Sequence, residues 1–177
     1  MEYTDQEGWE FTLEYANGVG LERAKKGFYI ENPKLMPDVH LHHNHFWHYP
    51  NNRFSGSGNI LIEDNVFENG ESAFLVFDLM HDWYESGRVK NLVCRNKTFI
   101  NCNGMGGESF FTICIFGVDE RNAPKVHERI EFSNNVFEGI KDKVIVASAL
   151  KELVLKDNVY KTDKKDLLRI DGAVKKI

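Results

Sequence analysis

The sequence has few of the features that mark membrane, secreted or nucleic-acid-binding proteins. No apolar run approaches the roughly 20 residues that a membrane-spanning helix needs. The 22 Lys and Arg are outnumbered by 27 Asp and Glu, and a net charge of -5 does not favour contact with nucleic acid or acidic lipid. The start, MEYTDQEGWE, is polar and acidic, unlike a signal peptide. We therefore expect a cytoplasmic protein or a fragment of a secreted one, with no nucleic-acid or membrane partner.

Cysteine is also scarce. Cys94, Cys102 and Cys114 are odd in number and lack the spacing of a zinc site. Buried free cysteines behave as small apolar side chains, so we expect these three to be reduced and mostly structural. A disulfide or a ligand role is the less favoured alternative. With 42% hydrophobic residues, the 177-residue chain can form one domain with a substantial core.

Five segments of the chain share one eight-residue template. They begin at residues 39, 60, 92, 130 and 153 and read VHLHHNHF, ILIEDNVF, LVCRNKTF, IEFSNNVF and LVLKDNVY. The first and third positions are apolar, the sixth is asparagine except for Lys97, and the eighth is aromatic. The starts lie 21, 32, 38 and 23 residues apart. A minimum near 21 residues with variable insertions is typical of a solenoid with loops between its coils.

The apolar period of two inside each copy predicts a β-strand. Asparagine tolerates left-handed backbone, so it suits a tight corner after the polar pair, and the following aromatic turns inward. Other β-like runs lie between copies, at 72–78, 110–118 and 143–149. The sequence therefore predicts an all-β fold, a single-stranded right-handed parallel β-helix of about five to six coils, with stacked inward ladders.

Within this fold, we expect residues 1–38 to form an N-terminal cap or first coil and residues 39–177 to form the parallel β-helix. An alternating apolar pattern suits a strand that covers the open first edge: Trp9, Phe11, Leu13 and Tyr15. The C-terminal stretch DLLRIDGAVKKI is lysine-rich, which commonly blunts a free edge. We expect a monomer or a weak dimer formed through the C-terminal end.

The stretch VHLHHNHFWH (39–48) holds five of the seven histidines. His40 and His42 share the outer face of a predicted strand, where they could hold a metal ion. The template aligns His42 and His43 with polar residues in each of the four other copies, and no carboxylate or cysteine belongs to the stretch. We therefore favour a solvated face over a metal site, and we expect no metal or other cofactor.

Lys97 interrupts the asparagine position in the third copy. An unpaired lysine is costly in a packed corner. We expect its ammonium group to reach solvent or a nearby acid, and the substitution Lys97→Asn to be neutral or stabilising.

The longest insertions follow the second and third copies, and binding residues concentrate on loops. HDWYESG (81–87) combines acids with the aromatics Trp83 and Tyr84. Aromatic rings stack on sugar faces, and two carboxyl groups flank the bond that a glycosidase cleaves. The segment suits a carbohydrate site; the alternative is that its aromatics anchor a loop against the core.

The order of GNILIEDNVFENGESAFLVFD, WYESGRVKNLVCRNKTFINC, FFTICIF and ERIEFSNNVFEG resembles glycoside hydrolase family 110 over about residues 30–160. The asparagine–aromatic ladder occurs in many β-helix proteins, whereas the order of strand, acid, WYESG and strand is more specific. The resemblance implies a pectin-lyase-like β-helix and a metal-free, inverting glycosidase that removes terminal α-1,3-linked galactose. Family members are several times longer, so it also implies a short or truncated relative.

The resemblance directs attention to the acid that precedes the WYESG segment. The family has two consecutive aspartates there, and this chain has Asp78-Leu79; where the family tends to have Pro-Glu, it has Val118-Asp119. Stacked strands lie about 4.8 Å apart, and the two carboxyl groups of an inverting glycosidase lie roughly 6.5–9.5 Å apart, so Asp78 and Asp119 on successive coils could act together. The candidate catalytic residues are Asp78, Glu85 and Asp119. The candidate substrate-binding residues are Trp83, Tyr84 and Glu108.

Two functions of different classes remain open at this stage. The first is a glycoside hydrolase-like β-helix that acts on or binds terminal α-galactosyl glycans, with an inverting two-carboxylate mechanism if active. The second is a non-catalytic carbohydrate-binding or structural β-helix from a larger protein. The first function and the binding form of the second make a carbohydrate the expected partner. The structural form of the second assigns no ligand. Polysaccharide lyase activity is less favoured because no cluster of acids suggests a calcium site.

Overall fold

The computed structural model describes residues 2–4, 8–10, 38–47, 58–70, 74–78, 89–103, 109–115, 125–171 and 174–177. The chain divides into two compact units, Met1–Asn32 and Pro33–Ile177. In the first unit, β1 (Glu2–Thr4) pairs antiparallel with β2 (Gly8–Glu10). The division into a cap of residues 1–38 and a β-helix of residues 39–177 stays a prediction.

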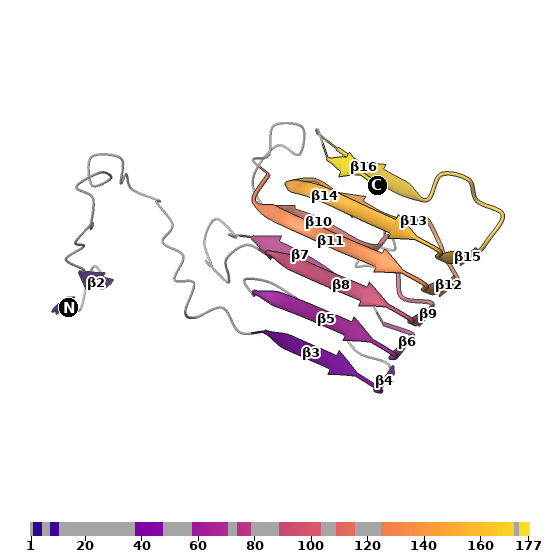
Figure 1. Cartoon of the computed structure of the whole chain (residues 1–177), viewed down its shortest axis with the longest axis horizontal. Helices are drawn as coiled ribbons and strands as arrows, with labels where there is room; N and C mark the ends of the chain where they lie inside the picture. Colours follow the sequence, from indigo (N-terminus) through magenta and orange to yellow (C-terminus); the bar gives the residue numbers. More distant parts are fainter. Residues whose placement is uncertain are drawn as a thin grey trace. The chain divides into compact units, whose positions relative to one another are not determined.

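The described residues of the second unit form three sheets, and all of the strands in these sheets pair in parallel (Figure 1). The first sheet consists of β3 (Val39–His42), β5 (Asn59–Glu63), β8 (Asn91–Arg95), β11 (His127–Ser133), β14 (Leu150–Lys156) and β17 (Lys175–Lys176). The second consists of β4 (His45–Trp47), β6 (Val66–Glu68), β9 (Thr98–Ile100), β12 (Val136–Glu138) and β15 (Val159–Lys161). The third consists of β7 (Phe74–Asp78), β10 (Ser109–Ile115), β13 (Lys143–Ala147) and β16 (Leu168–Ile170).

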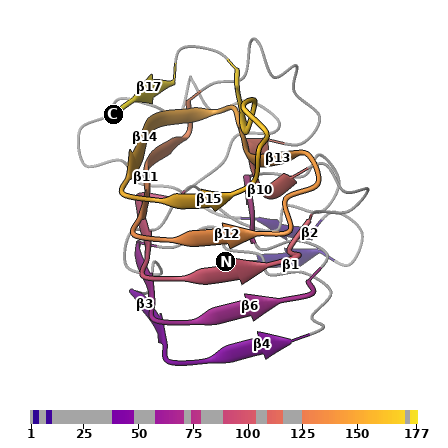
Figure 2. The same cartoon turned by 90° about the vertical axis from the view of Figure 1, so that its right-hand side faces the viewer.

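The chain visits the three sheets in a fixed order. Each template copy supplies one strand to the first sheet and one to the second, and among the described residues a strand of the third sheet follows in the second to the fifth copy. Figure 2 shows the strands of the second sheet stacked above one another, each leading off a strand of the first sheet at a corner. The predicted all-β class is confirmed for the described residues, which contain no helix. None of these residues forms a helix that is long and apolar enough to cross a membrane.

Each corner between the first and second sheets contains one residue with left-handed backbone. This residue is at the fifth template position, with φ between 52° and 55°: His43, Asp64, Asn96, Asn134 and Asp157. Asparagine and aspartate adopt this conformation more readily than most residues, which explains the polar character of the position. The expectation of left-handed backbone at the sixth-position asparagine is therefore wrong, because its neighbour fills that role. The asparagine does stand at the corner and bonds locally there, as Asn65 does by donating its Nδ2 to the Glu63 carbonyl at 3.0 Å.

The sixth-position asparagines instead form a hydrogen-bonded ladder between copies. The Oδ1 of Asn65 accepts the backbone N–H of Asn44 at 2.8 Å, and the Oδ1 of Asn158 accepts that of Asn135 at 3.1 Å. Each Nδ2 donates to the carbonyl of the third template position in the preceding copy: Asn65 to Leu41, Asn135 to Cys94 and Asn158 to Phe132. These bonds satisfy buried backbone groups where the chain turns and cannot pair as a strand.

Lys97 breaks this ladder from inside the protein. The expectation that its ammonium group reaches solvent or a nearby acid is wrong, because the residue is 1% exposed and its Nζ has no hydrogen-bond partner. Only its backbone N–H follows the pattern, donating to the Oδ1 of Asn135 at 3.0 Å. The error arose because the side chain was assigned to the outside by its charge, whereas the corner directs the sixth position inward.

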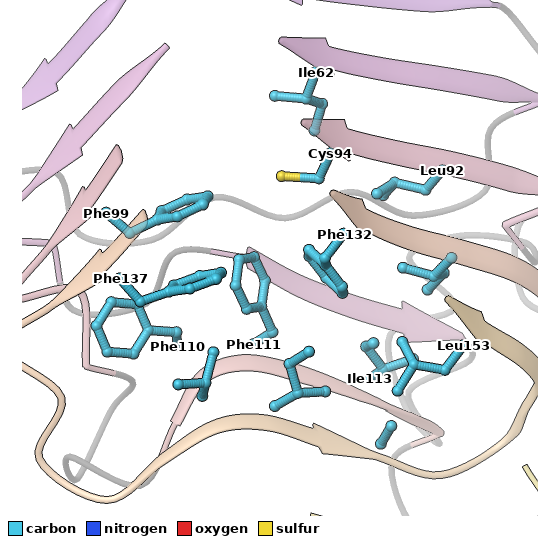
Figure 3. Close-up of a cluster of buried hydrophobic side chains, with 14 of the residues drawn as sticks. Ile62, Leu92, Cys94, Phe99, Phe110, Phe111, Ile113, Phe132, Phe137 and Leu153 are labelled. Atoms are coloured by element: carbon cyan, nitrogen blue, oxygen red, sulfur yellow. The ribbon is translucent and has the colours of Figure 1, made fainter. Parts of the chain in front are cut away.

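The core consists of inward ladders that run from copy to copy. The eighth-position rings Phe46, Phe67, Phe99, Phe137 and Tyr160 stack nearly parallel, with successive centroids 4.7, 5.2, 5.1 and 5.3 Å apart. The third positions are also in register, as predicted: Ile62, Cys94, Phe132 and Leu155. Figure 3 shows Phe99 and Phe137 beside Phe111, which the third sheet contributes. Cys94 and Cys102 are buried, and the Cys102 thiol donates to the Phe67 carbonyl at 3.2 Å, in line with the expected structural role.

Candidate functional site

The third sheet positions the acid that the sequence singles out. Asp78 is the last residue of β7, and the parallel register places it beside Ile115, the last residue of β10. The carboxyl ends of both strands therefore lie at one edge of the sheet. Asp119 follows Ile115 by four residues, which span at most about 14 Å of chain. The chain therefore leaves β10, on its way to Asp119, at the edge of the sheet where Asp78 lies.

The amino end of β10 lies at the opposite edge. Ser109 begins the strand and pairs with Lys143, six residues before the Ile115 that pairs with Asp78. At about 3.3 Å per residue, this separates the two edges by roughly 20 Å. Glu108 immediately precedes Ser109 in the sequence. The edge at which β10 begins is therefore not the edge that carries Asp78.

Five of the six candidate residues lie outside the described residues: Trp83, Tyr84, Glu85, Glu108 and Asp119. For Asp78 the structure describes the backbone and not the side chain. The predicted assignment of these six residues to catalysis and substrate binding remains a prediction. What the structure contributes is the common edge of β7 and β10.

Four histidines of the stretch 39–48 lie on β3, on β4 and at the corner between them, and His48 lies outside the described residues. His40, His42, His43 and His45 are all exposed, as the solvated-face interpretation predicts. The Nδ1 atoms of His42 and His43 are 2.8 Å apart. Within the described part of the chain, no three His, Cys, Asp or Glu side chains are placed to hold a metal ion.

A carboxylate does reach the histidines, although none occurs in their stretch. Glu63, in the second copy, pairs with the His40 Nε2 at 2.8 Å and with the Arg95 Nε and Nη2 at 2.8 and 2.7 Å. The Arg95 and His40 hydrogen bonds lower the pKa of Glu63. These groups are 23 and 32 residues apart from Glu63, so only the stacking of copies brings them together.

A polar column that the sequence analysis missed runs along the start of the first sheet. Its five members occupy the position just before the template in each copy: Asp38, Asn59, Asn91, Arg129 and Glu152. Asp38 accepts the Nδ2 of Asn59 at 2.9 Å, and Arg129 donates to the Oδ1 of Asn91 and the Oε1 of Glu152, each at 3.1 Å. Extending the template by one residue shows the signal, since all five residues there are polar.

One hollow has a volume of about 450 Å³ and lies against edge strands β15, β16 and β17. Tyr160, Leu155 and Leu168 form its apolar side, and Asp166 and Lys176 are among its polar residues. It contains none of the six candidate residues, so size alone does not place the sugar site here.

The described residues thus form an all-β unit of stacked parallel strands, with Asp78 at the end of one of them. No protein-family model matches this chain. The chain is 30% identical over 151 residues to an alpha-1,3-galactosidase B of Bacteroides thetaiotaomicron, covering 79% of this chain and 24% of that protein. It is 32% identical over 145 residues to an alpha-1,3-galactosidase A of the same species, covering 78% of the chain and 24% of the relative. An alpha-1,3-galactosidase A of Akkermansia muciniphila is 31% identical over 132 residues, with 73% and 21% covered.

These similarities confirm the relationship to α-1,3-galactosidases that the order of motifs indicated. The chain spans about a quarter of the length of the curated relatives it matches. An alignment that covers 79% of 177 residues leaves about 37 unmatched, so it includes the central region with β7 and β10.

Proposed function

We propose that this chain is part of a glycoside hydrolase-like protein that acts on or binds terminal α-galactosyl glycans. The observation that carries the proposal is the 30–32% identity to alpha-1,3-galactosidases across the region of β7 and β10. The backbone register supports it, because Asp78, the acid that the resemblance singles out, ends β7 at the edge where β10 also ends.

The finer proposal for the fold is a right-handed, pectin-lyase-like parallel β-helix. Its support is the constant order in which successive copies enter the first, second and third sheets. In such a solenoid the connections after β7 and β10 leave from one side. Loops from neighbouring coils can then combine into a single site on that side.

The proposed chemistry uses two carboxyl groups on opposite sides of the glycosidic bond. One protonates the leaving oxygen, and the other activates the water that attacks the anomeric carbon from the opposite face. Asp78 supplies one group, and Asp119 or Glu85 supplies the other. Trp83 and Tyr84 form the stacking platform for the sugar. Glu108 is the weakest of the proposed contacts because β10 begins at the edge away from Asp78.

A second function, carbohydrate binding without hydrolysis, is favoured by one residue. Leu79 follows Asp78 where the resemblance implies a second aspartate. A site with one acid fewer retains its shape and stacking surface but lacks a group that exchanges a proton. We therefore expect weak or absent hydrolysis of α-galactosides together with measurable binding.

The decisive experiment compares binding and hydrolysis of an α-1,3-linked galactobiose in matched variants. Asp78→Asn should leave the calorimetric affinity nearly unchanged and remove any residual hydrolysis. The control is Asp64→Asn, a corner residue whose position is asparagine in two other copies, and it should change neither quantity. Hydrolysis that persists in Asp78→Asn would contradict the role of Asp78. Folded protein that binds no galactose-terminated glycan would reject the carbohydrate proposal and leave the structural alternative.

A further inference from the structure

A second hollow lies on the outer side of the first sheet, at the start of β3, β5 and β8. Its volume is about 370 Å³, within the range of small-ligand sites. Most of its lining residues alternate with the buried positions of the same strands and therefore face outward: Asp38, His40, Asn59, Leu61, Asn91 and Val93. Asp78 ends a strand of the third sheet, so this hollow belongs to a different face from the proposed catalytic edge.

The floor and the rim of the hollow have different chemistry. Leu61 and Val93 are neighbours in register and are partly exposed, so they form a small aliphatic floor. The rim carries the amides of Asn59 and Asn91 with the carboxylate of Asp38. An aliphatic strip beside hydrogen-bonding groups is the pattern that a pyranose needs, because its ring has an apolar C–H face and polar hydroxyl edges.

Neighbouring groups orient the two side-chain amides of the rim. Asn59 donates its Nδ2 to the Oδ1 of Asp38 at 2.9 Å, which leaves its own Oδ1 as an acceptor. Asn91 accepts from the Nη1 of Arg129 at 3.1 Å through its Oδ1, which leaves its Nδ2 as a donor. The hollow thus presents an oriented acceptor and an oriented donor on adjacent strands. Hydroxyl groups, which both donate and accept, match this pair.

The charge around the hollow favours a neutral ligand. The described residues that line it include no lysine or arginine, and they include the carboxylate of Asp38. The nearby Arg95 guanidinium is already bound to Glu63. The Arg129 guanidinium beside Asn91 is likewise bound to the carboxylates of Glu131 and Glu152. A phosphate or a uronic acid would therefore meet the Asp38 carboxylate beside cations that are already paired with acids.

We propose that this hollow is a carbohydrate-binding subsite for neutral sugars, separate from the edge that carries Asp78. The small aliphatic floor sets an affinity of about millimolar, since the described lining residues include no tryptophan, tyrosine or phenylalanine that would supply a larger contact area. Such a subsite holds a branch of a glycan on the first sheet, whether or not the other edge hydrolyses it.

The test follows the side-chain NH₂ resonances of Asn59 and Asn91 in ¹⁵N-labelled full-length protein, assigned from their loss in Asn59→Asp and Asn91→Asp. Addition of α-1,3-linked galactobiose to about 50 mM should shift both resonances, and inorganic phosphate should not. Leu61→Lys fills the floor with a charged chain and should abolish the sugar-induced shifts. Val154→Lys is the matched control, because Val154 occupies the same column of the first sheet away from the hollow, and it should preserve them.

The outcomes separate this proposal from the one for Asp78. Shifts that persist in Trp83→Ala, which should weaken sugar binding at the edge that carries Asp78, place the binding in the hollow and not at the catalytic edge. The proposal is overturned if the two amides do not respond to the sugar in folded protein, or if Val154→Lys removes the response as completely as Leu61→Lys. Failure of galactoside hydrolysis has no bearing on either result.

Discussion

Replacing Lys97 with asparagine should stabilise the protein, and the ladder allows the size of the effect to be worked out. Burial lowers the pKa of Lys97 from 10.5 to about 8, so near pH 7 the side chain keeps a charge that the interior disfavours. A shift of that size corresponds to a penalty of about 3 kcal/mol. Asparagine removes this penalty.

Asparagine should also restore two hydrogen bonds of the ladder. By the pattern of the other copies, its Nδ2 would donate to the Ile62 carbonyl and its Oδ1 would accept the Asn65 N–H. Each bond contributes about 1 kcal/mol. The loss of three buried methylene groups costs about 2.4 kcal/mol. The balance is a gain of about 2–3 kcal/mol in the free energy of unfolding.

The pH dependence gives the prediction its sharpest test. Above pH 8 the folded protein releases the Lys97 proton, whereas the unfolded chain keeps it until about pH 10.5. The unfolded state then binds more protons, so wild-type stability should gain up to about 3 kcal/mol from this residue between these pH values. In Lys97→Asn this contribution is absent.

Urea unfolding followed by circular dichroism at pH 7 and at pH 9.5 measures both effects. Lys156→Asn is the matched control, because it removes an exposed lysine at the end of β14 in the first sheet, and it should leave stability and its pH dependence nearly unchanged. A lower free energy of unfolding for Lys97→Asn, or the same pH dependence in Lys97→Asn and wild type, would refute the reasoning.

Four further predictions concern stability, sugar binding and the oligomeric state. Phe137→Ala should cost about 3–5 kcal/mol in urea unfolding, because the ring is fully buried in the aromatic ladder; a cost below about 1 kcal/mol, or one matched by Val159→Ala at a 52% exposed site, would contradict this. Gly139→Ala should lower the melting temperature, since φ is 68° and the new Cβ would lie 2.0 Å from the Asn101 Oδ1; an unchanged melting temperature would count against it. Trp83→Ala should weaken binding of galactobiose in calorimetry whether or not the protein hydrolyses it, and unaltered affinity would remove the proposed stacking platform. Light scattering should show a monomer or a weak dimer, and a tight, large assembly would reject that expectation.

The sequence by itself determined the parts of the fold that repeat locally. Alternation within eight residues places Ile62 and Phe67 inward and His40 and His42 outward, because successive side chains of a strand point to opposite faces. The equivalent places in each copy then predict the stacked aromatic ladder. The order of these strands around WYESG also indicated the relationship to α-1,3-galactosidases.

Only the tertiary structure decided which copies' polar groups meet. The contacts of Glu63 with His40 and Arg95 depend on the register between strands separated by insertions of different length. The burial of Lys97 likewise follows from the direction of the corner, which its charge does not disclose. Periodicity is a property of one strand and is visible within a short stretch of sequence. Register and corner direction instead arise from backbone hydrogen bonds between strands that lie far apart in the sequence.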